Sequence, residues 1–173
     1  PNFFQRSKGL IEDNIQFKEH NITLEHYIIT TGLKPMVQGS KLNEHLTNIF
    51  ASEFIEGNNE DGKPQISEIA RAVGYTNKTR FLYEINKGCN VNNRIAVNMK
   101  MADSMKRVPF EYMIYVGDGQ TDVPCFSTLN SEKGTSLAVY HPNSEKAFKE
   151  AFQLRKEGRV VAFAEADYRK GSH

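Results

Sequence analysis

Two aspartates follow an apolar run in the second half of the sequence. Residues 112–116 read Tyr-Met-Ile-Tyr-Val and are followed by Gly-Asp-Gly-Gln-Thr-Asp at 117–122, which contains Asp118 and Asp122. The apolar run predicts a buried strand, and open α/β sheets bind ligands at the carboxyl ends of their strands. Two close carboxylates at such a point favour a hard cation such as Mg²⁺ that serves a phosphate group. The glycines permit a tight turn, and Pro124 suits the first turn of a following helix.

Three segments, in this order along the chain, resemble motifs of the haloacid dehalogenase superfamily of phosphotransferases. Residues 117–122 resemble the fourth motif of that superfamily. Residues 27–32 form an apolar run that ends in hydroxyls and glycine, and they resemble the second motif with Thr30 at its Ser/Thr position. Residues 77–80 open a helical pattern and resemble the third motif, with Lys78 as its lysine. The order of the three segments strengthens the resemblance.

The resemblance implies a magnesium-dependent phosphomonoester hydrolase that acts on a small phosphorylated metabolite. A phosphate ester repels anions, so its hydrolysis needs a cation and positive side chains around the transferring group. In that scheme Asp118 is a direct Mg²⁺ ligand. Asp122 either holds a metal-bound water or orients Lys78, which makes it both a metal-site and a catalytic candidate.

The implied phosphate-binding residues come from the other two motifs. The hydroxyl of Thr30 and the backbone amides of Thr31 and Gly32 would hydrogen-bond a phosphate oxygen. Lys78 would offset the negative charge on the nucleophile and on the phosphate together. Thr30 and Lys78 are therefore the catalytic candidates beside Asp122.

The first motif of the superfamily, an Asp-x-Asp sequence at the end of the first strand, is absent from these 173 residues. The resemblance implies that one missing aspartate forms an aspartyl-phosphate and that a second acts as general acid and base. The chain begins with Pro1, so we expect the nucleophile strand and any substrate-selecting cap to lie in an upstream segment of the same protein. We expect the chain alone to hydrolyse nothing.

Apolar periodicity along the chain alternates between strand and helix patterns, which predicts a single α/β domain over residues 1–173. The expected fold is a doubly wound, mostly parallel, Rossmann-like sheet with helices on both faces and its first strand missing. The missing strand would lie between the strands that end at Thr30 and Asp118, unless those two strands close directly onto each other. Strands are predicted at 27–29, 49–55, 112–116, 136–140 and 159–163, and helices at 3–17, 78–86, 99–105, 122–129 and 144–156.

Composition excludes some function classes. A net charge of +1, from 22 basic and 21 acidic residues, gives no broad basic field for nucleic acid. Apolar runs are too short to span a membrane, and Cys89 and Cys125 lack a metal-ligand spacing. These features predict a soluble, cytoplasmic protein whose partner is a small phosphorylated molecule.

Each candidate residue also has a purely structural interpretation. Asp118 could be an ordinary turn residue, and Asp122 could serve only as a helix N-cap. Thr30 could lie at a strand end because of its β-propensity. Lys87 is a rival to Lys78, although its place at the end of a helical pattern suits a cation that the helix dipole favours.

Residues 66–83 support a different hypothesis, a helix-turn-helix module that binds DNA. Ala70 would lie where two helices touch, and Gly74 would lie in the turn. Residues 77–80 would then open the recognition helix and face bases and phosphates. This alternative competes with the hydrolase interpretation for Lys78, because each assigns that side chain to a different ligand.

Overall fold

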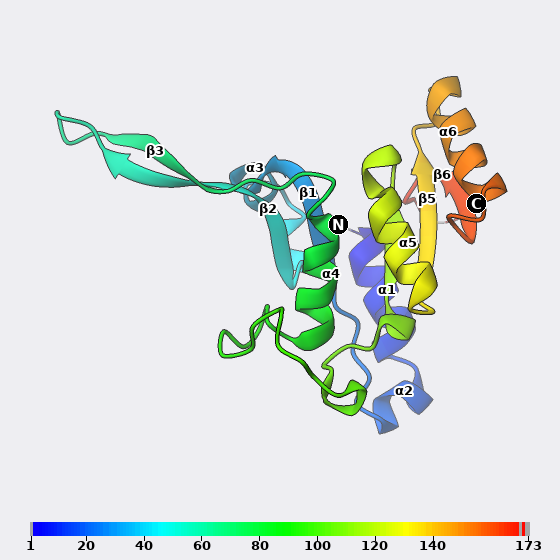
Figure 1. The fold of residues 1–173 in the computed structure, drawn as a ribbon. Helices are drawn as coiled ribbons and strands as arrows, with labels where there is room; N and C mark the ends of the chain where they lie inside the picture. The colour runs from blue at the N-terminus through cyan, green and yellow to red at the C-terminus, as the bar shows by residue number, and fades with distance from the viewer. Residues whose placement is uncertain (1, 170, 172–173) are drawn as a thin grey trace. The chain divides into compact units, whose positions relative to one another are not determined.

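The computed structural model describes residues 2–169 and 171, and it divides the chain into two compact units at residues 1–73 and 74–173. Each unit contains its own three-stranded sheet with flanking helices (Figure 1). The chain is therefore a mixed α/β protein, which confirms the predicted class, while the single doubly wound domain stays a prediction. Among the described residues, no helix is long and apolar enough to cross a membrane.

The first unit is built on a sheet with the strand order β1-β2-β3. Strands β1 and β2 run parallel, whereas β2 and β3 run antiparallel. The most deeply buried side chains of this sheet are Ile49, Phe50 and Ala51 on β2. The elements of the unit are α1 (Asn2–Glu12), α2 (Ile15–Glu19), β1 (Tyr27–Leu33), α3 (Lys34–Gln38), a 3₁₀ turn (Asn43–His45), β2 (Asn48–Asn58) and β3 (Pro64–Arg71).

Strand β2 continues past the parallel sheet to form a long antiparallel hairpin with β3. We call residues 53–71 the β2–β3 arm; it is drawn in cyan and green-cyan in Figure 1. All eight residues of β3 are exposed. The tip is closed by the Asn59 side chain, whose Oδ1 accepts the backbone N–H groups of Asp61 and Lys63 at 3.1 and 2.8 Å. Gly62 occupies the left-handed region there, with φ of 78°.

The β2–β3 arm shows that the helix-turn-helix interpretation of residues 66–83 is wrong. Residues 66–71, predicted in that hypothesis as its first helix, belong to β3 and pair with β2. The spacing of Ile66, Ile69 and Ala70 is helical in the sequence, but register shifts in the hairpin produce the same spacing in a strand. Only the second predicted helix exists, so this segment is not a helix-turn-helix.

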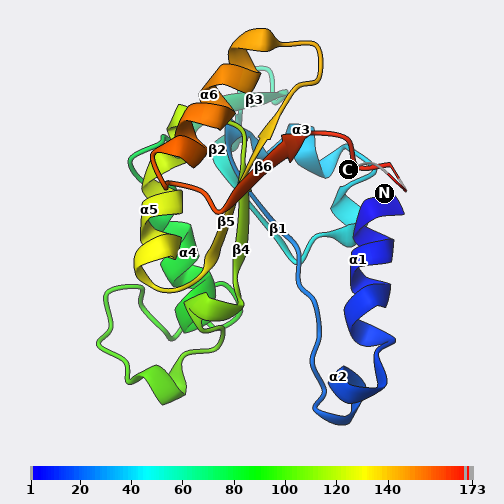
Figure 2. The same ribbon diagram turned by 90° about the vertical axis from the view of Figure 1, so that its right-hand side faces the viewer.

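The second unit contains a fully parallel sheet with the order β4-β5-β6. Helices α5 and α6 connect these strands, and both contact β5 (Figure 2). This is the repeated β-α-β arrangement that the sequence predicted for this part of the chain. Its elements are α4 (Lys78–Lys87), β4 (Ile114–Gly117), α5 (Val123–Ser131), β5 (Thr135–Tyr140), α6 (Glu145–Lys156) and β6 (Ala162–Glu165), with 3₁₀ turns at Asp103–Met105, Phe110–Tyr112 and Gln120–Asp122.

The core of the second unit forms between its sheet and its helices. Phe126 of α5 and Leu154 of α6 are almost completely buried there together with Val160. Helix α6 begins at Ser144, whose hydroxyl accepts the N–H of Ala147 at 3.2 Å. The predicted helix at 99–105 is wrong except for one 3₁₀ turn at Asp103–Met105, although Met101, Ala102 and Met105 have helical spacing in the sequence.

Candidate active site

The loop between β4 and α5, residues 118–122, is called the site loop. Its shape depends on the close approach of the backbone to helix α5. Gly117 is the last residue of β4, and a Cβ atom there would lie only 2.7 Å from both the Asp122 Cβ and the Phe126 ring. Such contacts are far inside van der Waals distance, so glycine is required at this position. The chain then passes through Asp118 and a 3₁₀ turn into α5, with Pro124 in the first turn of the helix.

Asp122 is the centre of a buried hydrogen-bond cluster. Its Oδ1 accepts the Lys78 ammonium at 2.8 Å and the Tyr115 hydroxyl at 2.7 Å. Its Oδ2 accepts the backbone N–H of Asp118 at 3.1 Å. Asp122 also occupies the N-cap position of α5, but its side chain makes no capping bond. The carboxylate therefore holds the site loop and the lysine rather than the end of the helix.

Lys78 is the first residue of α4 and turns inward. Only 7% of its side chain and 5% of the Asp122 side chain are exposed, and Nζ also lies 3.5 Å from the Thr121 hydroxyl. Helix α4 packs against α5, and this packing places the Lys78 ammonium beside the site loop. The rival Lys87 instead donates to the carbonyls of Val97 and Met99, at 2.6 and 2.7 Å, in the loop that follows α4. Of the two, Lys78 is the lysine that contacts a predicted site residue, Asp122.

Tyr115 is a member of the cluster that sequence reasoning missed. Its ring packs edge-on against Phe126 with centroids 5.7 Å apart, and burial raises the pKa of its hydroxyl, with Cys125 and Asp122 adding to the effect. A signal existed, since Tyr115 and Gly117 are two residues apart on one strand and so point to the same face. Burial also raises the pKa of the neighbouring Cys125 thiol to about 11, so that thiol stays protonated at neutral pH.

Asp118 lies on the surface side of the loop, with its carboxylate exposed to solvent. Burial raises the pKa of the Tyr168 hydroxyl, in the segment after β6, and the negative charge of Asp118 raises it further. Strands β4, β5 and β6 are parallel, so their carboxyl ends lie at one edge of the sheet. The loop thus combines one exposed carboxylate with a buried, paired one.

The phosphate-binding candidates of the second motif belong to the first unit. Thr30 is half-buried near the end of β1, where its hydroxyl accepts the N–H of Gly32 at 3.1 Å. The carbonyl of Thr31 accepts the Ser52 hydroxyl at 3.1 Å. The structure brings together Lys78, Asp118 and Asp122, whereas the approach of Thr30 to these residues stays a prediction.

The residues of the loop suit Mg²⁺ chemically. Mg²⁺ commonly binds through one or two carboxylates and completes its shell with water and substrate phosphate. The exposed Asp118 carboxylate offers such a ligand, and Asp122 Oδ2 has one further lone-pair direction beside its bond to the Asp118 amide. No group of three or more His, Cys, Asp or Glu side chains suited to a metal occurs among the described residues.

Comparison with known proteins gives one relative. A protein of Borreliella burgdorferi (strain ATCC 35210 / DSM 4680 / CIP 102532 / B31), described as an uncharacterized protein, is 32% identical over an alignment of 187 residues. The alignment covers 98% of this chain and 63% of the relative, so the chain spans less than two thirds of the relative's length. No protein-family model and no solved structure matches the chain.

Proposed function

We propose that the protein is a magnesium-dependent phosphomonoester hydrolase of the haloacid dehalogenase superfamily that acts on a small phosphorylated metabolite in the cytoplasm. The observation that carries the proposal is the buried Lys78–Asp122 ion pair, 2.8 Å long, beside the exposed carboxylate of Asp118. Burying an ion pair costs desolvation energy and adds little net stability, so its presence at a loop after a parallel strand favours a functional role.

The chemistry follows from the charges of the loop. When bound, Mg²⁺ would be held by Asp118 and would neutralise charge on the transferring phosphoryl group. Asp122 fixes the Lys78 ammonium, which has three N–H groups and therefore retains donor capacity for a phosphate oxygen. The Thr30 hydroxyl and the amides of Thr31 and Gly32 would supply further donors to the phosphate.

The finer fold belongs to the same proposal. Strand β1 lies at one edge of its sheet and β4 lies at one edge of the other. On β4, Ile114 and Val116 are 67% and 45% exposed, although both are β-branched apolar residues typical of buried parallel strands. We propose that an upstream strand carrying the nucleophilic aspartate pairs with these edges and completes a doubly wound sheet.

Magnesium-dependent phosphate binding tests the proposed site without requiring turnover. Isothermal titration of the 173-residue chain with inorganic phosphate should show binding that Mg²⁺ strengthens. Asp118→Asn should weaken this binding by about tenfold or more, because it removes the charge that holds the cation. Asp61→Asn, which neutralises an exposed carboxylate at the arm tip, is the matched control and should leave binding unchanged. Equal Mg²⁺ dependence in Asp118→Asn and the unmodified chain would rule out Asp118 as the metal ligand.

A further inference from the structure

The β2–β3 arm exposes a strand edge that the described residues leave without a neighbour. Strand β3 ends the order β1-β2-β3, so one side of its backbone faces away from the sheet. A two-stranded hairpin is marginally stable in water, and a long exposed edge strand is a template for pairing with another strand. The arm therefore has both an available edge and a physical reason to use it.

The arm also carries apolar side chains on one face. Phe54 pairs with Ile69 and Glu56 pairs with Ile66, and residues 54 and 56 share a face of β2. Ile66 and Ile69 consequently lie on one face together with Phe54. The two isoleucines are 64% and 68% exposed, and Phe54 is also exposed. Exposed isoleucine on an edge strand is a feature of surfaces that associate.

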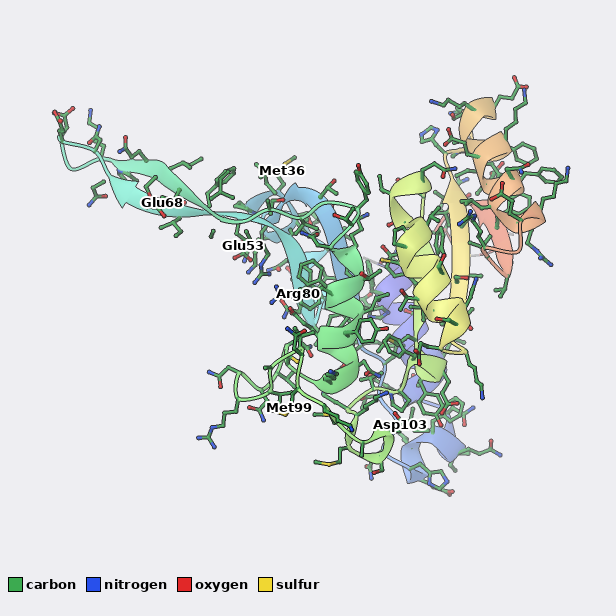
Figure 3. The ribbon with its side chains drawn as sticks, viewed as in Figure 1. Met36, Glu53, Glu68, Arg80, Met99 and Asp103 are labelled. Atoms are coloured by element: carbon green, nitrogen blue, oxygen red, sulfur yellow. The ribbon has the colours of Figure 1, made fainter. Side chains whose placement is uncertain are left out.

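The charge of the β2–β3 arm limits the kinds of partner that it can bind. Residues 53–71 contain five acidic and two basic side chains, a net charge of −3. This charge disfavours nucleic acid and anionic lipid as partners. Strand β3 itself carries one acidic and one basic side chain, Glu68 and Arg71, so its own net charge is zero and a second β3 strand meets no net repulsion along it. Figure 3 shows Glu53 at the base of the arm and Glu68 farther out along it.

We propose that two copies of this chain associate through antiparallel pairing of their β3 strands. With full overlap, Pro64 lies opposite the partner's Arg71 and Ile66 lies opposite the partner's Ile69, and the symmetry repeats both pairs. Each isoleucine then meets another isoleucine, which is a favourable cross-strand pair. In the same alignment Glu68 lies opposite the partner's Ser67, so no two side chains of like charge face each other directly across the pair.

The pairing explains the length of the arm as well as its composition. Joining two hairpins produces a four-stranded antiparallel sheet, in which each β3 becomes an inner strand with both sides paired. The interface is isologous, as a two-fold dimer requires, because the same segment is used by both copies. It is independent of the site loop in the second unit, so it holds or fails separately from the proposed hydrolase function.

Sedimentation velocity of the chain tests the association. We expect a dimer with a Kd on the order of 10 µM, as suits a small interface. Ile69→Lys should weaken dimerisation by at least about tenfold, because it places a charge in the apolar centre of the pairing. Ile55→Lys is the matched control, since Ile55 is exposed on the opposite face and on the inner strand β2. A monomer at about ten times that concentration, or a dimer that survives Ile69→Lys, would overturn the proposal.

Cross-linking tests the strand alignment. A mixture of Ile66→Cys and Ile69→Cys chains should form a disulfide-linked dimer under mild oxidation, because those two positions face each other across the pair. Either variant alone should cross-link much less, since each position is then offset from its own copy by three residues along the strand. No cross-link in the mixture, in a sample that sediments as a dimer, would contradict antiparallel pairing of β3.

Discussion

Asp122 shows how one carboxylate can organise a site. Three donors converge on it from different parts of the second unit: the ammonium of Lys78, the hydroxyl of Tyr115 and the backbone N–H of Asp118. Hydrogen bonds to an ionised group are stronger than those between neutral groups, so the cluster fixes both the lysine and the loop. Asp122 is thereby better suited to positioning its neighbours than to serving as the main metal ligand.

Tyr115→Phe is expected to loosen this cluster without emptying the core. The variant keeps the ring that packs on Phe126 but removes one donor to Asp122, which should cost about 1–3 kcal/mol of unfolding free energy. Mg²⁺-dependent phosphate binding should fall several-fold, because Asp122 then holds Lys78 and Asp118 less firmly. Chemical denaturation and isothermal titration measure the two effects.

Tyr140→Phe provides the comparison for that experiment. Tyr140 lies on the adjacent strand β5, and its ring contacts Phe148 and Phe163 rather than the Asp122 cluster. Phosphate binding should be the same as in the unmodified chain. If Tyr115→Phe also leaves both stability and binding unchanged, its hydroxyl has no role in positioning Asp122.

At the scale of elements, helix α4 was predicted correctly and strand β3 was missed, and each outcome has its own physical cause. Helix α4 begins at Lys78 and stops before Gly88, which adopts φ of 84°, as the helix-stop pattern predicts. Strand β3 was missed because a register shift between Ile55 and Glu56 puts Ile66 and Ile69 on one face despite their odd spacing. The sequence pattern of a bulged strand resembles a helix, and only the pairing with β2 distinguishes them.

The site shows the same division between local and long-range information. Asp118 and Asp122 were predictable because strand, turn and helix are adjacent in the chain. Lys78 required a family resemblance, since it reaches Asp122 from 44 residues away. Tyr115 was missed because its place on the same strand face as Gly117 does not by itself tell which polar group its hydroxyl will meet.

Helix α1 packs against His26 in a manner that should make the first unit sensitive to acid. The His26 ring meets Phe4 edge-on at 4.8 Å and its Nε2 lies 3.0 Å from the Ser7 hydroxyl. Burial lowers the pKa of His26 below 6.5, and the charges of Lys8 and His45 lower it further. Below that pH the unfolded chain binds the proton more readily than the folded chain, so stability falls as pH decreases through about 6.5.

Thermal unfolding followed by circular dichroism should show this effect as a Tm that is a few degrees lower at about pH 5.5 than at about pH 7.5. His26→Gln should reduce the pH dependence, because it removes the group that resists protonation. His20→Gln, at an exposed position of the same unit, should retain it. A pH dependence that is unchanged in His26→Gln would show that other groups control acid sensitivity.

At the scale of the whole molecule, the proposed reaction needs more than these residues supply. The 173 residues contain no Asp-x-Asp sequence, and each unit has an edge strand beside which a further strand could pair. The chain with Mg²⁺ should therefore show no hydrolysis of p-nitrophenyl phosphate above the buffer rate. A form encoded with an upstream aspartate-bearing strand should hydrolyse it, and Asp118→Asn in that form should lose about 100-fold or more in kcat/KM.

Turnover by the chain itself would contradict that expectation and place the nucleophile within residues 1–173. An active-site titration with a phosphate analogue that traps covalent intermediates, followed by peptide mass spectrometry, would then identify the modified side chain. A longer form that folds but hydrolyses no phosphate monoester would instead favour a binding role.

Gly117 ties the loop chemistry to the interior directly behind it. A single methyl group at this position would press on Asp122 on one side and on Phe126 on the other. A shift that relieved the contact with one of these residues would tighten the contact with the other, because both contacts are made to the same Cβ position. Steric exclusion therefore permits only glycine at residue 117, whichever ligand the loop binds.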